Sequence, residues 1–351
     1  MKNKKYILNS IFLIVLMLGT GYFLFKDQEL SELLKYIRLA DIRYLLLGVV
    51  FLLIYVSFES VIIHYLMKTL SYTVKFIHCL KYSFIGFFVS AITPSATGGQ
   101  PAQLIYMSSD GISMAISSLV LIIVTIAYKA VLLFLAFIML IFEYDFVMSH
   151  ISNIVFIMVF GILVNVVVIG VLMVVIFKQS FAKRTIGKII LFLGKHKLLK
   201  NHDKVLRNLL NSMSKYDAGA AYLKTHKRVF FNVFIITLIQ RLALFAITYA
   251  VYKAFGLTEY GAIEIITLQL IISLAVDNLP LPGGMGASEG IFLLIFEEIF
   301  TSTFITAGLL LSRGLSYYLI IILGGAVLAV AQITRKKRII ENDKTIGAQK
   351  W

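Results

Sequence analysis

The sequence predicts an all-α polytopic membrane protein with about six full transmembrane helices and two re-entrant hairpins. Of its 351 residues, 60% are hydrophobic and only 15% are charged, whereas a soluble domain is about a quarter charged. Runs of roughly 20 apolar residues, long enough to cross a hydrocarbon core about 30 Å thick, recur along the chain. The 33 Lys and Arg residues outnumber the 18 Asp and Glu residues, and almost all of them lie between the apolar runs. A nucleic-acid-binding protein gathers its basic residues on one folded face, so we expect no nucleic-acid partner.

Six apolar runs are expected to cross the membrane completely. The first follows three lysines and has no small-x-small cleavage site, so we interpret it as an uncleaved span rather than a signal peptide. The six expected spans are 6–25, 44–67, 113–142, 150–177, 229–252 and 304–333. Two further apolar stretches, 76–93 and 262–279, each run into a cluster of Pro and Gly.

The distribution of positive charge predicts the topology. Segment 178–228 carries 13 Lys and Arg residues but only two acids, Asp203 and Asp217, which places it in the cytoplasm by the positive-inside rule. That placement requires stretch 76–93 to enter and return on the cytoplasmic side, because a full crossing would put the basic loop outside. The same count of membrane crossings makes 262–279 a hairpin that enters from the outer side and returns there. We therefore expect a multi-pass protein of the bacterial plasma membrane with both termini in the cytoplasm.

The two Pro/Gly clusters suggest an inverted repeat. The first reads TPSATGGQPAQ at 93–103 and the second LPLPGGMGASE at 279–289. Aligning the Gly-Gly pairs gives an offset of 185, which also superposes span 44–67 on 229–252. The two units run in opposite directions, as in many transporters with discontinuous helices. We expect one integral membrane domain over 1–351, with repeat 1 at about 1–142 and repeat 2 at about 150–333, interrupted by the basic loop 178–228. Chance similarity between two Gly/Pro-rich turns is the alternative.

The hairpin tips are candidate parts of a binding or translocation site. Non-helical backbone at membrane depth is tolerated only where protein buries it or water reaches it, and all four prolines of the chain lie in these tips. Proline interrupts the entering helix, while adjacent glycines permit backbone geometries that other residues resist. The alternative is that the tips only turn the chain. The candidate tip residues are Pro94, Gly98, Gly99, Gln100, Gln103, Pro280, Pro282, Gly283 and Gly284.

Ionisable residues inside apolar runs are the second group of candidates. A charge within the bilayer costs several kcal/mol unless it is paired or hydrated, so each marks a functional hypothesis. Lys129 and Arg313 lie at nearly equivalent positions under the 185 offset, and Arg241 is a third cation. Their possible partners are Glu59, Asp277 and Glu289. For each cation a structural salt bridge and contact with a ligand remain open, and the near-symmetry of Lys129 and Arg313 favours function for that pair.

Several kinds of chemistry find little support in the sequence. One cysteine, Cys79, permits no internal disulfide, and the histidines have no metal-site spacing. The segment 286–290 matches G-x-S-x-G, but a hairpin tip supplies no strand and no histidine lies deep in a span. We therefore expect no catalytic residue, no metal and no cofactor.

The motifs T-P-x-x-x-G-G-x-P-A-Q and P-x-P-G-G-x-G-x-x-E, in this order, resemble those of the bacterial flippase-like membrane family. This family is also labelled the lysylphosphatidylglycerol synthase transmembrane region. Its best-known member is the N-terminal domain of the multiple peptide resistance factor, and the resemblance covers nearly the whole chain. It implies translocation of a phospholipid such as aminoacyl-phosphatidylglycerol between leaflets. The large soluble domain that a synthase needs has no counterpart here, because the longest polar segment is 178–228.

The expected function is therefore that of a lipid flippase with a cavity between the two repeats. Lys129, Arg313 and Arg241 would compensate the lipid phosphate, and Asp277 and Glu289 are candidates for proton coupling. The expected partners are membrane phospholipids, with a separate lipid-modifying enzyme and a homo-oligomer as further options. A membrane component of lipid modification and a small-solute secondary transporter are the alternative functions.

Overall fold

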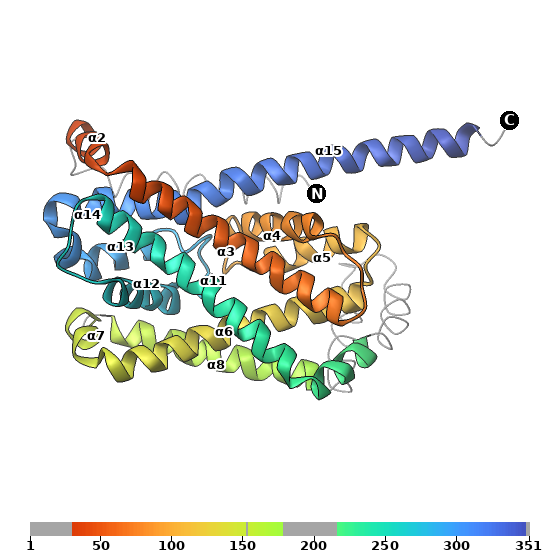
Figure 1. The fold of residues 1–351 in the computed structure, drawn as a ribbon, viewed down its shortest axis with the longest axis horizontal. Helices are drawn as coiled ribbons and strands as arrows, with labels where there is room; N and C mark the ends of the chain where they lie inside the picture. Colours follow the sequence, from red (N-terminus) through yellow and green to blue (C-terminus); the bar gives the residue numbers. More distant parts are fainter. Residues whose placement is uncertain (1–29, 152–153, 178–215, 349–351) are drawn as a thin grey trace.

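The structure, a computed structural model, describes residues 30–151, 154–177 and 216–348 and is helical throughout its spans (Figure 1). The expected span 6–25 and most of the expected basic loop lie outside the described residues. Five helical segments in the described part are long and apolar enough to cross a membrane, which confirms the all-α polytopic class. These segments are α3 (Ile42–Thr69), α6 (Met114–Phe142), α8 (Val155–Phe177), α11 (Lys227–Ala254) and the run from α14 (Glu297–Arg313) through η1 (Gly314–Tyr318) into α15 (Leu319–Ala348).

Helices α3 and α11 form the centre of the molecule and cross it in opposite directions (Figure 1). At one end Asp41 N donates to Ala254 O at 2.8 Å, and in the middle Gln240 Nε2 donates to Tyr55 O at 3.1 Å. Both helices have 28 residues, and their first residues and their last residues are each 185 positions apart. The two helices therefore begin and end at equivalent positions under the offset found in the sequence.

The stretch expected as the first hairpin forms two helices, α4 (Phe76–Ala91) and α5 (Gly99–Ser109), joined by tip 1, residues 92–98. With 16 residues, α4 rises only about 24 Å, which is less than the hydrocarbon thickness. Lys81 Nζ on α4 lies 2.5 Å from Asp110 Oδ2 just after α5, so α5 returns along α4. Burial raises the pKa of Asp110, but hydrogen bonds from Lys81 and Tyr82 outweigh burial and hold this pKa below its usual value.

The second hairpin has the same plan. Helix α12 (Ala262–Val276) has 15 residues, tip 2 covers residues 277–286, and α13 (Ala287–Ile295) leads away from the tip. A buried cluster that includes Leu268, Ile272, Phe292 and Phe296 packs α12 against α13 and α14. Both predicted re-entrant stretches are thus short helices that end in an irregular tip inside the bundle.

The remaining elements differ from the sequence prediction mainly at their ends. The expected span 150–177 begins later, at Val155, because α7 (Tyr144–Ile151) forms a separate short helix before it. The last helical run begins at Glu297 rather than 304, with a kink at Thr301, whose φ is 58°. It ends in the long α15, which extends beyond the other helices (Figure 1). A short helix, α2 (Leu30–Leu39), precedes α3.

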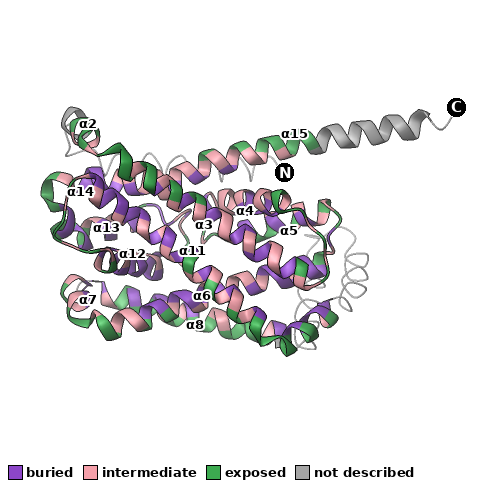
Figure 2. Cartoon of the chain, viewed as in Figure 1, coloured by how far each residue is buried: buried purple, intermediate pink, exposed green. Residues whose placement is uncertain are grey.

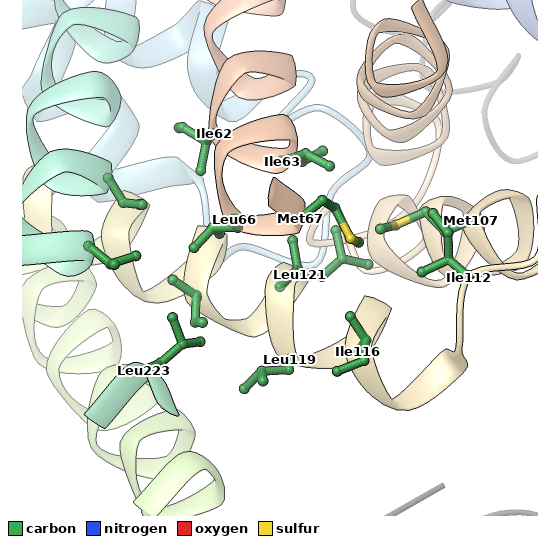
Figure 3. Close-up of a cluster of buried hydrophobic side chains, with 14 of the residues drawn as sticks. Ile62, Ile63, Leu66, Met67, Met107, Ile112, Ile116, Leu119, Leu121 and Leu223 are labelled. Carbon is green, nitrogen blue, oxygen red and sulfur yellow. The ribbon is translucent and has the colours of Figure 1, made fainter. Parts of the chain in front are cut away.

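Burial is distributed as expected for helices surrounded by lipid. Most of α8 is exposed or half-buried (Figure 2), and only 17% of its apolar window is buried. Phe156 and Val167 of α8 are among the exposed apolar residues of the molecule. One core cluster lies where α3, α5 and α6 meet (Figure 3). Leu223, from a helix at 216–225 within the expected basic loop, also belongs to this cluster.

Candidate functional site

The two hairpin tips meet inside the bundle. Pro94 of tip 1 and Pro282 of tip 2 form an isolated antiparallel bridge, and Ser95 Oγ donates to Leu279 O at 3.1 Å. The hydroxyl of Tyr317 donates to Ala91 O, at the end of α4, at 2.9 Å. Residues more than 180 positions apart are therefore held together by one backbone bridge and by side-chain hydrogen bonds to backbone carbonyls, with Pro94 and Pro282 at the junction.

The glycines of tip 1 do not have the role that the sequence suggested. Gly98 has φ −84°, within the right-handed region, and Gly99 is already the first residue of α5. The left-handed residues of this tip are Ser95, with φ 49°, and Ala96, with φ 53°. Gly99 is instead required for close packing, because a Cβ atom there would lie 2.7 Å from the carbonyl oxygen of Gly86.

Tip 2 follows the expectation more closely. Gly283, Gly284 and Gly286 all have positive φ, at 56°, 68° and 83°, a region that glycine enters without steric cost. A Cβ atom on Gly283 would also lie 2.1 Å from the ring of Tyr317. The two tips thus reach similar positions through different local geometry, with left-handed non-glycine residues in one and glycines in the other.

A cavity of about 570 Å³ lies beside the junction of the tips, between α3, α4, α5, α6, α11 and α12. Nine of the residues singled out from the sequence line it: Glu59, Gln100, Gln103, Lys129, Arg241, Asp277, Gly283, Gly284 and Arg313. The other six, Pro94, Gly98, Gly99, Pro280, Pro282 and Glu289, are not among its lining residues. The structure therefore brings residues from both hairpins and from four long helical runs to one internal space.

Lys129 is a buried cation without an acidic partner. It lies on α6, only 8% exposed, and its Nζ donates to Asn278 Oδ1 at 3.1 Å. Within the described part of the chain, no carboxylate oxygen lies within 4.0 Å of this ammonium group. A neutral amide compensates an ammonium charge only in part, so the positive charge remains available to an anion in the cavity.

Arg241 is the second buried cation of this kind. Its guanidinium carbon lies 3.6 Å from the centre of the Tyr128 ring and 5.2 Å from that of Tyr55, and Nη1 donates to the Tyr55 hydroxyl at 3.4 Å. Among the described residues it also has no carboxylate within 4.0 Å. Its Nε and the side-chain nitrogen of Asn278 are buried without a hydrogen-bond partner in this part of the chain.

Arg313 differs from the other two cations because it is paired. Its Nε lies 2.7 Å from Glu289 Oε1, with side-chain exposures of 15% and 4%, and its Nη2 donates to Gly283 O at 3.0 Å. The second carboxylate oxygen of Glu289 accepts from Gly286 N at 2.7 Å, at the start of α13. Arg313, Glu289 and tip 2 thus form one connected structural unit, which makes Arg313 unlike Lys129 despite their near-equivalent positions in the sequence.

Two carboxyl groups line the same cavity. Asp277, at the start of tip 2, accepts a hydrogen bond from the Tyr128 hydroxyl, and Glu59 on α3 accepts one from Gln103 Nε2 at 2.7 Å. Gln100, near the start of α5, donates to the Thr125 hydroxyl. The cavity therefore has acidic as well as basic groups along its wall.

Sequence analysis singled out neither Asn278 nor the aromatic residues of the site. Asn278 directly follows Asp277 at the end of an apolar run, which is a local signal that could have identified it. Tyr55, Tyr128 and Tyr317 look like ordinary core aromatics in the sequence, although Tyr128 falls opposite Arg313 under the 185 offset and Tyr317 follows Arg313 by four residues. The contacts of Arg241 with Tyr55 and Tyr128 depend on the crossing of helices that are far apart in the chain, whereas Tyr317 lies four residues after Arg313 on the same helical run.

The arrangement is suited to binding an anion rather than a metal. The described residues contain no group of three or more His, Cys, Asp and Glu side chains that could hold a metal ion. Two cations with no carboxylate within 4.0 Å among the described residues line one internal space instead. Charge-assisted hydrogen bonds from Lys and Arg to phosphate or carboxylate are among the strongest in proteins.

Comparison with known proteins agrees with the motifs in the sequence. The family described as "Lysylphosphatidylglycerol synthase TM region" matches residues 8–324. The chain is also similar to the UPF0104 membrane protein PH1989 of Pyrococcus horikoshii. The two are 25% identical over 309 residues, which is 84% of this chain and 89% of the relative.

Proposed function

The chain belongs to the lysylphosphatidylglycerol synthase transmembrane-region family, and from this premise we propose that it moves a phospholipid between the leaflets of its membrane. The headgroup passes through the cavity at the junction of the tips, while the acyl chains remain in the bilayer. The family name points to lipid handling, and translocation is the specific activity that we propose.

One observation carries this proposal, namely the buried and uncompensated donors of the cavity. Lys129 and Arg241 have no acidic partner among the described residues, and Arg241 Nε and Asn278 Nδ2 have no hydrogen-bond partner there. Buried charges are normally paired, and both cations line the cavity, so an anionic ligand would complete the site. A phosphate supplies both the negative charge and the acceptor oxygens.

The pairing of Arg313 refines the assignment of roles. Its charge is matched by Glu289 and it holds the Gly283 carbonyl, so we propose that it maintains the shape of tip 2. Lys129 and Arg241 would then compensate the lipid phosphate. The contact between Pro94 and Pro282 would be the constriction that the headgroup passes.

We further propose that the two halves are an inverted repeat. The 185-residue spacing of the ends of α3 and α11 supports it. So does the meeting of Tyr55 with Gln240, two residues separated by 185 positions, at the middle of the antiparallel pair. A two-fold axis of pseudosymmetry through this point would exchange the hairpins. Such symmetry would allow the cavity to open to either side in turn.

The finer assignments remain part of the proposal. The family name suggests an aminoacyl-phosphatidylglycerol, such as lysylphosphatidylglycerol, as the first substrate to examine. We propose a bacterial plasma membrane with both termini in the cytoplasm, on the basis of the positive-inside distribution. We propose a separate lipid-modifying enzyme as the source of an aminoacylated lipid. A homo-oligomer would be compatible with the exposed apolar face of α8.

A leaflet-specific assay in proteoliposomes tests the function. Headgroup-labelled phosphatidylglycerol and lysylphosphatidylglycerol are placed in one leaflet, and their appearance in the other is followed with an impermeant quencher. We expect the wild-type protein to accelerate exchange and Lys129→Met to slow it at least about tenfold, which corresponds to about 1.4 kcal/mol. Lys68→Met, the same substitution at an exposed residue near the end of α3, is the matched control and should behave as wild type.

Two outcomes would contradict the proposal. Exchange no faster than in protein-free liposomes for either lipid would exclude translocation of these substrates. Equal slowing by Lys129→Met and Lys68→Met would show that the effect of charge removal is general and that the cavity cation has no special role.

A further inference from the structure

Glu59 is a buried carboxyl group in the cavity wall that has no basic partner in the described structure. It lies in the middle of α3, 7% exposed, and its Oε1 accepts a hydrogen bond from Gln103 Nε2 at 2.7 Å. No Lys, Arg or His nitrogen of the described residues lies within 4.0 Å of it. An isolated carboxylate in such a place is costly, and protonation is the usual way in which a buried acid avoids that cost.

The other charged groups of the cavity have contacts of their own, although Arg241 also acts on Glu59 from beyond 4.0 Å. Arg241, on α11, is stacked on Tyr128, and Lys129, on α6, is bound to Asn278. Helices α4 and α5 contribute no charged residue to the cavity, and their polar group nearest to Glu59 is Gln103. The titratable and charged groups that line the cavity with Glu59 are Tyr55, Tyr128, Lys129, Arg241, Asp277, Arg313 and Tyr317.

The two acids named from the sequence as proton-coupling candidates are less suited to this role. Glu289 is ion-paired to Arg313 and bound to Gly286 N, so its charge is fully compensated. Asp277 accepts a hydrogen bond from the Tyr128 hydroxyl, and the guanidinium of Arg241 stacks on the ring of the same tyrosine. Glu59 has only neutral amides, of Gln103 and Gln240, as side-chain hydrogen-bond donors and no cation within 4.0 Å among the described residues, so a proton is its simplest compensation.

Glu59 also lies where binding of a proton can change the contact between the first hairpin and the central helices. Glu59 belongs to the central pair α3 and α11, whereas Gln103 belongs to the return helix of the first hairpin. The side chain of Gln103 lies against the backbone of Gly86, where a Cβ atom would come within 2.4 Å of Nε2, so its amide is fixed to the hairpin. A hydrogen bond to a carboxylate is roughly twice as strong as one to a neutral acceptor. Protonation of Glu59 therefore weakens the bond between the hairpin and the central pair.

We propose that Glu59 is a proton-binding site and that one proton bound and released there per cycle couples lipid movement to a transmembrane proton gradient. The proton comes from water on one side, is added to a carboxylate oxygen of Glu59, and leaves to water on the other side after the tips have rearranged. No bond of the lipid is made or broken, and no electron is transferred. This inference rests on the proposed lipid translocation and adds its source of energy.

The test measures the distribution of lipid between leaflets under imposed pH gradients of both polarities. A gradient of one pH unit supplies 1.36 kcal/mol per coupled proton, so it should shift the steady-state ratio of labelled lipid by up to about tenfold. For wild-type protein we expect opposite shifts for the two polarities. For Glu59→Gln, which keeps the size and the polar contacts, we expect the same ratio under both. Replacing sodium on both sides by an impermeant cation should leave the wild-type result unchanged.

A second measurement does not depend on transport. Infrared difference spectra of the purified protein between acidic and alkaline pH should show the stretching band of a protonated carboxyl group that is absent in Glu59→Gln and retained in Asp277→Asn. The infrared measurement identifies the protonated residue even if Glu59→Gln moves too little lipid to measure.

The possible failures can be told apart. If wild-type protein redistributes lipid identically under both gradients, coupling is refuted and the flippase function stands. If the gradient effect persists in Glu59→Gln, follows sodium instead, or if the infrared band is lost only in Asp277→Asn, Glu59 is not the site. If the wild-type protein moves no lipid at all, the proposed function fails together with this inference.

Discussion

Replacing Arg313 and replacing Lys129 by methionine should have opposite consequences for stability and transport. Arg313 Nε lies 2.7 Å from Glu289 Oε1, and both side chains are largely buried. Removal of one partner from a buried ion pair typically costs about 3–5 kcal/mol, because it leaves the other charge uncompensated. We expect Arg313→Met to lower the free energy of unfolding by about this amount and to disorganise tip 2 through the lost bond to Gly283 O.

Lys129→Met removes a different interaction. The variant loses one hydrogen bond from a charged group to the amide of Asn278, worth about 1.5–3 kcal/mol, but it also removes a buried ammonium whose desolvation penalty is of comparable size. We therefore expect a change in the free energy of unfolding within about 1 kcal/mol, together with a strong loss of lipid exchange. Unfolding in mixed micelles followed by circular dichroism, beside the leaflet assay, measures both quantities.

The double variant Arg313→Met, Glu289→Met is the internal control for this prediction. A buried ion pair replaced as a whole by apolar side chains is often close to neutral, so the double variant should recover much of the stability lost in Arg313→Met. The distinction between the two cations would be refuted if Arg313→Met were as stable as wild type while Lys129→Met unfolded readily.

Three further predictions concern the tips and the topology. Gly99→Ala should lower the free energy of unfolding by about 1–3 kcal/mol through overpacking against α4. Gly290→Ala, with open space around its Cβ, is the control and should not lower it. Equal effects of the two variants in denaturation experiments would contradict this packing role of Gly99. Ala96→Gly should raise the free energy of unfolding by up to about 1 kcal/mol, because it relieves a left-handed alanine; a destabilised variant would refute the strain. In a Cys79→Ser background, Tyr222→Cys should be protected from an impermeant thiol reagent in intact cells and labelled after lysis, and labelling in intact cells would refute the cytoplasmic loop.

Much of the fold follows from the sequence because the bilayer restricts the choices. Apolar runs longer than 20 residues have few alternatives to a spanning helix, and the helices α3, α6 and α11 begin and end within two residues of the expected spans. The shorter runs before the Pro/Gly clusters were recognisable as hairpins because a full crossing conflicted with the charge distribution. Boundaries were less predictable, as α7 and the kink at Thr301 show.

The details of the site were harder to obtain because they depend on contacts between distant segments. The sequence identified Lys129, Arg241 and Arg313 as buried cations, but only the fold shows that Arg313 has a carboxylate partner and that the other two have none among the described residues. In tip 1 the Gly-Gly pair suggested a backbone geometry that other residues resist, whereas the structure shows that Gly99 is needed for the close approach of α5 to α4. Local sequence cannot distinguish a glycine needed for its φ angle from one needed for its size.

The central claim is that a phospholipid headgroup enters the cavity between the tips. The most direct measurement is photo-crosslinking in membranes with a phospholipid that carries the photoreactive group on its headgroup, followed by mass spectrometry of the labelled peptides. The account predicts labelling of the peptides that contain Lys129 and Asn278, with competition by excess unlabelled lipid and a marked loss in Lys129→Met. Labelling confined to the outward face of α8, unchanged by competitor or by Lys129→Met, would contradict it.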